Sequence, residues 1–237
     1  MKKMIYILMA LLCSTSVLFS EFSTVKIVSV TGQVKVREGL DENWIPAREG
    51  MQLKIVDTIL SESEARAVID IPGKGRFVIG GNTLLDIGDL REISEKEMFL
   101  FLMSQKVKKM SPSDGKTELK IGNVSVVHGE DRGKTDATTT DQRKNLRREQ
   151  EKNGAEALYS HHYFTNAVVK LTNIILRYPG INDCGEVYFF LGKAFEALNK
   201  IGQAMDAYRQ VLNQKDCNSA SARKWSAEAQ QALERLK

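Results

Sequence analysis

Histidine, cysteine and tryptophan are scarce in this sequence of 237 residues, which contains three histidines, three cysteines and two tryptophans. Of the histidines, His128 stands alone, and His161 and His162 would point about 100° apart on a helix, a poor arrangement for one metal ion. A Gly-x-Ser-x-Gly motif is absent, so the sequence offers no nucleophile of the serine-hydrolase type. We therefore expect surface histidines, no metal, no cofactor and no enzymatic activity.

A complete phosphate-binding loop is also missing. The segment Gly129–Thr135 places three residues between its two glycines, whereas a P-loop needs four so that successive backbone amides can surround the phosphates. The second Gly-Lys-Thr, at 115–117, has Met110 where the earlier glycine should stand. Nucleotide binding is not predicted.

No long apolar run is present. The run Met4–Leu12 follows Lys2 and Lys3 and is shorter than the roughly 20 residues that cross a bilayer. Together with the small residues before Ser20, it predicts a secretory signal peptide over residues 1–20. A membrane anchor is the alternative interpretation. A lipoprotein signal at Cys13 is disfavoured, because the residue before that cysteine should be small and is leucine.

Net charge is low as well. Loss of residues 1–20 removes two lysines and no acid, which lowers the formal charge from +4 to +2. Such a balance leaves no large field of one sign that would suggest nucleic acid as a partner. We expect a periplasmic or outer-membrane-associated protein.

Two cysteines, Cys184 and Cys217, follow the predicted cleavage site. Cys184 precedes the first helix of a predicted antiparallel pair and Cys217 follows the second, so these two ends should lie side by side. Extracytoplasmic compartments permit disulfides. A disulfide between them is geometrically reasonable if their Cα atoms come within about 4.4–6.8 Å. Two free thiols are the alternative.

Residues 21–128 show the alternation of a small all-β domain with one added helix. Glycines separate candidate strands at 25–30, 34–36, 54–60, 66–71, 76–79, 83–87, 118–121 and 124–127. The helix is predicted over 94–110, where Ser94 and Glu97 form a capping box. Its apolar run, Met98–Met103, favours burial between the β domain and another part of the chain. Because lysines follow this run, a helix lying on a membrane surface is the alternative.

The order of short motifs in residues 24–90 resembles the FecR domain. The residues that carry the resemblance are Gly32, Val34, Trp44, Gly50, Asp57, Ala65 and Asn82. The resemblance implies a twisted, solenoid-like β module that works outside the cytoplasm. In FecR proper this module follows a transmembrane helix and relays receptor signals, whereas here it directly follows the predicted signal peptide, which argues against direct sigma-factor regulation.

A charged linker that runs into the solvated start of a helix is predicted over 129–149, because mixed charge there lacks apolar periodicity. Amphipathic helices follow in residues 150–237, and two of them form a hairpin over Gly185–Leu212. We expect Gly192 and Ala204 to let these two helices approach closely, with Tyr208 filling the adjacent space.

The helical region resembles the tetratricopeptide repeat, in two units and a capping helix that carries Trp225. The first unit supplies Ala155, Leu158, Ala167, Leu171 and Pro179, and the second supplies Tyr188, Leu191, Gly192, Phe195, Ala204 and Tyr208. Arrays of this repeat usually present a concave surface to a peptide or protein partner.

The sequence as a whole predicts a multidomain α+β protein and a non-enzymatic adaptor that binds protein partners in the cell envelope. An envelope sensor related to FecR regulation and recognition of cell-wall polysaccharide by the β module are the alternatives. Contact with a membrane surface, contact with peptidoglycan and self-association also stay open.

Overall fold

The computed structural model describes residues 24–110, 137–179, 183–214 and 220–237. In these residues the chain forms two antiparallel four-stranded sheets followed by six α-helices. The fold is therefore mixed α+β, as the sequence predicts. The predicted signal peptide and the predicted strands at 118–121 and 124–127 lie outside the described residues.

The two sheets have the strand orders β4-β1-β6-β7 and β3-β2-β5-β8. The first sheet consists of β1 (Val25–Thr31), β4 (Gln52–Leu53), β6 (Arg66–Ile71) and β7 (Gly75–Ile79). The second consists of β2 (Val34–Arg37), β3 (Trp44–Pro46), β5 (Thr58–Ser61) and β8 (Thr83–Asp86).

Alternating side chains define the inner face of the first sheet. In β6, Ala67 and Ile69 are fully buried, whereas Arg66 and Asp70 are exposed. Successive residues of a strand point to opposite faces, so this pattern places one face on the core and leaves the other in solvent. Burial of Phe77 and Ile79 continues the inner face in β7.

Strand β5 begins four residues later than the sequence predicts. Residues Lys54–Asp57 form a turn in which the backbone N–H of Asp57 donates to the carbonyl of Lys54 at 3.0 Å. The carboxylate of Asp57 accepts from the N–H of Lys54 at 2.7 Å and from that of Gly39 at 2.9 Å. Because the aspartate side chain satisfies these two amides, the segment bends instead of extending.

Six helices follow the sheets in the described residues. They are α2 (Glu95–Met110), α3 (Ala137–Ser160), α4 (Phe164–Arg177), α5 (Glu186–Ala197), α6 (Ile201–Leu212) and α7 (Ala220–Arg235), and a short 3₁₀ helix, η1 (Ile87–Leu90), precedes them. From α3 to α7 each helix contacts the next. Three residues join α3 to α4 and α5 to α6, so each of these pairs forms an antiparallel hairpin.

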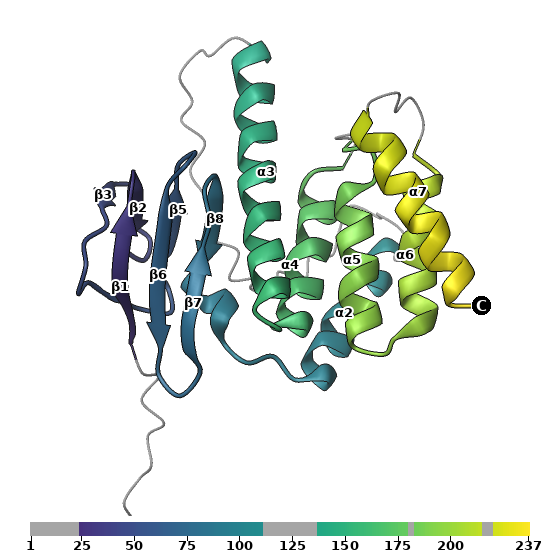
Figure 1. Ribbon diagram of the computed structural model, residues 1–237, viewed down its shortest axis with the longest axis horizontal. Coiled ribbons are helices and arrows are strands. Elements are labelled where there is room, and N and C mark those ends of the chain that lie inside the picture. The colour runs from purple at the N-terminus through teal and green to yellow at the C-terminus, as the bar shows by residue number, and fades with distance from the viewer. Residues whose placement is uncertain (1–23, 111–136, 180–182, 215–219) are drawn as a thin grey trace, which may run out of the picture.

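Helix α3 corrects the linker predicted at 129–149. It begins at Ala137 and lies between the sheets and the other helices (Figure 1), so residues 137–149 are helical. The first turns of α3 are polar, so apolar periodicity does not reveal them. Ion pairs one turn apart support the helix instead, such as Arg147 with Glu151 at 3.1 Å and Lys152 with Glu149 at 2.7 Å.

The apolar run of α2 is buried on one side only, which corrects the expectation of burial between two parts of the chain. Met98 is buried and α2 contacts α4, but Phe99, Leu100 and Met103 are exposed. No helix in the described residues is long and apolar enough to cross a membrane.

One hydrophobic core extends from the sheets into the helices. It includes Ile69 of β6, Leu158 of α3 and Tyr208 of α6. The β part and the helical part are thus packed against each other.

Candidate functional site

The end of α3 fastens the helices to the outer edges of β7 and β8. The imidazole Nε2 of His161 accepts from the backbone N–H of Val78 at 3.0 Å, and its ring stacks on Phe77 at 4.2 Å between centroids. The side-chain amide of Asn153 donates to the carbonyl of Asn82 at 2.7 Å. His161 is therefore a structural residue. The sequence predicts surface histidines, and for His161 this prediction is wrong. His161 also follows the end of α3, and His162 has a left-handed backbone, so the two do not share a helix.

Helix α4 is joined to η1 by polar side chains. The buried amide of Asn166 donates to the carbonyls of Asp89 and Arg91, at 2.6 Å each. Thr165 donates to the carbonyl of Ile93 at 2.8 Å. These bonds satisfy the carbonyl of Asp89 in η1 and those of Arg91 and Ile93 just after it.

A chain of charged groups crosses the same interface. The buried ammonium of Lys170 in α4 binds the carboxylate of Asp89, and it lies 3.8 Å from Asp86. Asp86 accepts from the hydroxyl of Thr58 at 2.7 Å, and Thr58 accepts from Arg37 at 2.9 Å. Burial favours the neutral amine, but the negative charges of Asp89 and Asp86 outweigh it and raise the pKa of Lys170.

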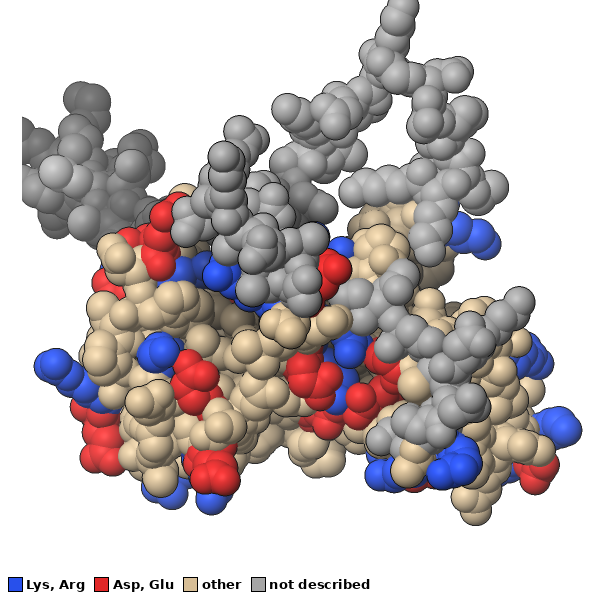
Figure 2. Space-filling model, turned by 90° about the horizontal axis from the view of Figure 1, so that it is seen from above, with Lys and Arg blue, Asp and Glu red and all other residues tan. Residues whose placement is uncertain are grey.

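A second buried lysine lies between α3 and α5. The ammonium of Lys152 is 2.7 Å from Glu149, 3.5 Å from Glu156 and 2.9 Å from Glu186. Burial opposes its charge, yet hydrogen bonds to Glu149 and Glu186 raise the pKa of Lys152. Figure 2 shows acidic and basic side chains intermixed over the described part of the upper face. Lys152 and its three glutamates thus neutralise one another's charge and link α3 to α5.

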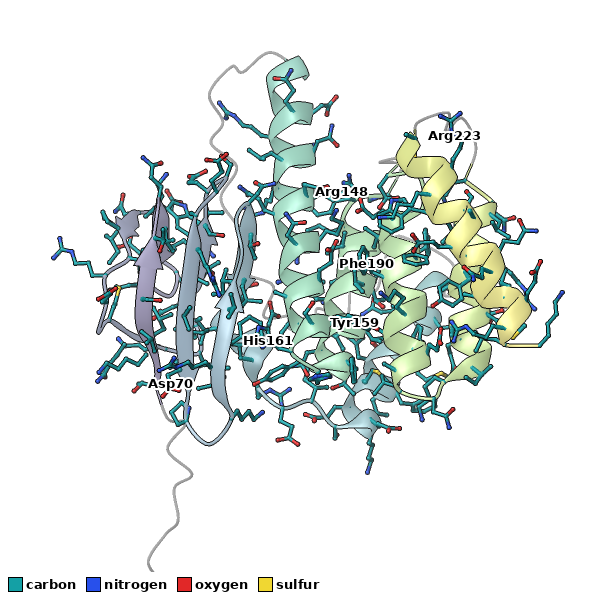
Figure 3. The ribbon with its side chains drawn as sticks, in the orientation of Figure 1. Asp70, Arg148, Tyr159, His161, Phe190 and Arg223 are labelled. Atoms are coloured by element: carbon teal, nitrogen blue, oxygen red, sulfur yellow. The ribbon has the colours of Figure 1, made fainter. Side chains whose placement is uncertain are left out.

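Aromatic and cationic side chains gather on α3, α5 and α7. The ammonium of Lys193 lies 5.1 Å from the ring centre of Tyr159 and 5.8 Å from that of Phe190. Phe190 meets Trp225 edge to face at 5.6 Å, and the ammonium of Lys224 lies 4.4 Å from the ring centre of Trp225. We call these five residues the aromatic face, and Figure 3 labels Tyr159 and Phe190.

Every member of the aromatic face except Lys224 is partly buried. The three aromatic rings therefore combine a packed side with an accessible side. Neither Lys193 nor Lys224 has a carboxylate within 4 Å among the described residues. Sequence reasoning named only Trp225 and missed Tyr159, Phe190, Lys193 and Lys224. The apolar stripe of α5 already includes Leu191, so the extra phenylalanine beside it was the signal that could have found this surface.

The residues predicted from the helical repeat lie mostly in the core. Gly192 is packed so tightly that a Cβ atom there would lie 2.5 Å from the ring of Tyr208. Ala204 and Tyr208 are buried, and Tyr208 donates to Glu196 at 2.9 Å. Of the other predicted residues, Ala155, Leu158, Ala167, Leu171, Leu191 and Phe195 are buried, Tyr188 is partly buried and Pro179 is exposed.

The residues predicted from the β module lie mainly at turns. Gly32 has a φ of +73°, and a Cβ atom there would lie 3.0 Å from the Cα of Ala65. Positive φ also occurs at Gly50 and Asn82. Val34 and Asp57 are buried, and Trp44 is partly buried, with the guanidinium of Arg37 5.4 Å from its ring centre. The predicted residues of the β module therefore either adopt the backbone conformations of turns or pack in the interior.

The candidate disulfide stays a prediction, because Cys217 lies outside the described residues. Cys184 lies just before α5 with a left-handed φ of 58°.

A depression of about 390 Å³ lies on the outer face of the first sheet. Its lining residues are Lys26, Ile27, Val28, Gly50, Asp70 and Arg76. Asp70, labelled in Figure 3, pairs across the strands with Lys26 and with Arg76, so charges of opposite sign alternate along the row. In the described residues no group of three His, Cys, Asp or Glu side chains is arranged to hold a metal ion.

Comparisons of the chain with protein-family models, with curated proteins and with solved structures gave no significant match.

Proposed function

We propose that this chain is a non-enzymatic extracytoplasmic adaptor of the cell envelope, and that its helical part binds a protein or peptide partner on the aromatic face. The observation that carries the proposal is the position of Lys193 against Tyr159 and Phe190, with Trp225 beside Phe190. Aromatic residues with partly accessible rings are enriched in the energetically dominant parts of protein interfaces.

The aromatic face favours a partner segment that combines apolar and acidic side chains. The rings of Phe190 and Trp225 would cover an apolar side chain, and the ammonium groups of Lys193 and Lys224 would attract carboxylates. Because the rings of Tyr159, Phe190 and Trp225 pack against the core, they lose little conformational entropy on binding.

The resemblances to the FecR domain and to the tetratricopeptide repeat are parts of the same proposal. The hairpins α3–α4 and α5–α6, with α7 packed against α6, support a repeat-like arrangement. In this proposal the β module contributes a second contact, and its fixed attachment to α3 and α4 keeps both contacts in one orientation. The envelope location rests on the predicted signal peptide.

The aromatic face is tested by photo-cross-linking in living cells. A photoreactive amino acid replaces Phe190 in one protein and Leu40, which is far more exposed and lies in the β part, in the control. We expect a discrete cross-linked protein from position 190, its yield at least fivefold lower when Lys193→Glu is added. Lys54→Glu makes the same charge change in the β part and should leave the yield unchanged.

Equal cross-linking from positions 190 and 40 would overturn the proposal, as would a yield that does not respond to Lys193→Glu. Thermal unfolding of each variant shows whether a lost cross-link reflects a lost fold.

A further inference from the structure

Helix α2 carries apolar side chains on the side that faces away from the protein. Phe99, Leu100 and Met103 are 56%, 56% and 41% exposed, whereas Met98 on the opposite side is 3% exposed. A helix on the surface of a globular protein normally has a polar outer side. Exposed apolar residues grouped in this way mark an interaction surface.

Two lysines lie in the same strip of the helix surface. Lys96 precedes Phe99 by three residues, and Lys106 follows Met103 by three residues, which places all of them on one side of α2. We call Lys96, Phe99, Leu100, Met103 and Lys106 the α2 outer face. It extends for about 15 Å along the helix axis, with a cation at each end.

The acidic residues of α2 do not offset these cations. Glu95 binds Lys200 at 2.6 Å. Glu97 binds Arg91 at 3.0 Å and accepts from the backbone N–H of Ser94 at 2.8 Å, so the capping box occupies it. Lys96 and Lys106 have no carboxylate within 4 Å among the described residues. The α2 outer face is therefore apolar in its middle and positive at its ends.

We propose that the α2 outer face docks on the surface of an anionic lipid bilayer. A bilayer offers acyl chains for Phe99, Leu100 and Met103 and phosphate groups for the two lysines, and it requires no shape match with a single projecting helix. The inner side of the helix stays attached to the protein through Met98 and its contact with α4. Docking would thus hold the whole molecule at the membrane without inserting it.

Flotation of the purified protein with lipid vesicles tests this proposal. Each protein starts at Glu21, because the apolar run Met4–Leu12 would itself bind lipid, and every described residue is retained. Vesicles of phosphatidylcholine with about one third phosphatidylglycerol should carry the protein upward, and vesicles of phosphatidylcholine alone should carry much less. High salt should release the protein from the anionic vesicles.

Matched variants distinguish binding through the α2 outer face from nonspecific binding of the protein to vesicles. Phe99→Ser with Met103→Ser should lower the partition coefficient at least tenfold. Leu40→Ser with Val56→Ser removes apolar groups of the β part that are more exposed than Phe99 and Met103, and it should leave binding unchanged. Lys96→Gln with Lys106→Gln should lower binding about twentyfold, since each lysine near an anionic surface contributes about fivefold. Lys26→Gln with Lys54→Gln makes the same change of net charge elsewhere and should have little effect.

A fluorescent substitution adds a second readout. Phe99→Trp keeps the apolar character, so binding should persist and the added emission should shift to shorter wavelength on anionic vesicles. The proposal is overturned if the protein does not float, if the α2 variants bind like the wild type, or if sedimentation shows a dimer that Phe99→Ser with Met103→Ser dissociates. The last result would identify a second copy of the chain as the occupant. None of these results affects the cross-linking test of the aromatic face.

Discussion

The Nε2 atom of His161 accepts a hydrogen bond from the backbone N–H of Val78 at 3.0 Å, which joins the end of α3 to the free side of β7. Only an unprotonated Nε2 can accept this bond. Burial of the imidazole lowers the pKa of His161 below its ordinary value, so the folded protein resists the proton that the unfolded chain takes up near pH 6.5.

We therefore expect a dependence of stability on pH. The contribution of His161 to the free energy of unfolding should be constant above about pH 7.5 and fall as the pH drops through about 6.5, by up to about 1.4 kcal/mol per pH unit until the lowered pKa is reached. Urea unfolding from pH 8 to pH 5 measures this slope. His161→Gln keeps an acceptor but does not titrate, so it should remove this contribution, whereas His162→Asn should keep it. An unchanged slope in His161→Gln would contradict the assignment.

Gly154 should tolerate no side chain. A Cβ atom at this position would lie 2.3 Å from the carbonyl oxygen of Leu84, and both partners are backbone that the core holds in place. We expect Gly154→Ala to lower the free energy of unfolding by about 1–3 kcal/mol through overpacking. Gly202→Ala is the matched control, because nothing lies within 4 Å of its Cβ position and alanine favours helix. Equal stability of the two variants in urea unfolding would show that α3 and β8 can separate without cost.

Lys170 should be essential to the interface between α4 and η1. Lys170→Met keeps the apolar stem and removes the charge, which leaves Asp89 and Asp86 without their ammonium partner. We expect a loss of about 3 kcal/mol, the lower end for a broken buried ion pair because Asp86 is half exposed.

Adding Asp89→Asn should recover part of this loss, since the uncompensated carboxylate is then gone. Denaturant unfolding of the two single variants and the double variant completes the cycle. Simple additivity would contradict the coupling between Lys170 and Asp89.

The Cys184–Cys217 disulfide can be tested by thiol titration. In the denatured, unreduced protein that starts at Glu21, we expect no free thiol, and two after reduction. Reduction should lower the free energy of unfolding by about 3–4 kcal/mol in the chain-entropy model. Two free thiols before reduction would show that Cys184 and Cys217 are not bonded.

Local patterns allowed the prediction of much of this fold. The capping box of α2 forms as the sequence indicates, with the N–H of Glu97 donating to the hydroxyl of Ser94 at 3.2 Å. Both residues lie within one helical turn, so the sequence contains the whole interaction. The stripes of α4, α6 and α7 were found for the same reason, because burial of one side gives an apolar period of 3.6.

Interactions between distant residues escaped prediction. Val78 and His161 are 83 residues apart, and neither carries a local sign of the other. The start of α3 escapes prediction because its first turns are polar and show no apolar period, and the ion pair Arg147–Glu151 lies in the middle of the helix. The aromatic face combines side chains of three helices, so no single helix pattern contains it.

The position of α3 also limits how another protein could attach to the sheets. A strand from a partner can extend a sheet only along an uncovered edge with free backbone groups. Helix α3 contacts β7 and β8, one edge strand of each sheet. The opposite edges are β4, which has two residues, and β3, which ends in Pro46 and therefore lacks one donor. Addition of a partner strand is therefore disfavoured, as is the open-ended polymer that strand addition can form. A partner of the β module should bind instead through side chains on the outer faces of the sheets.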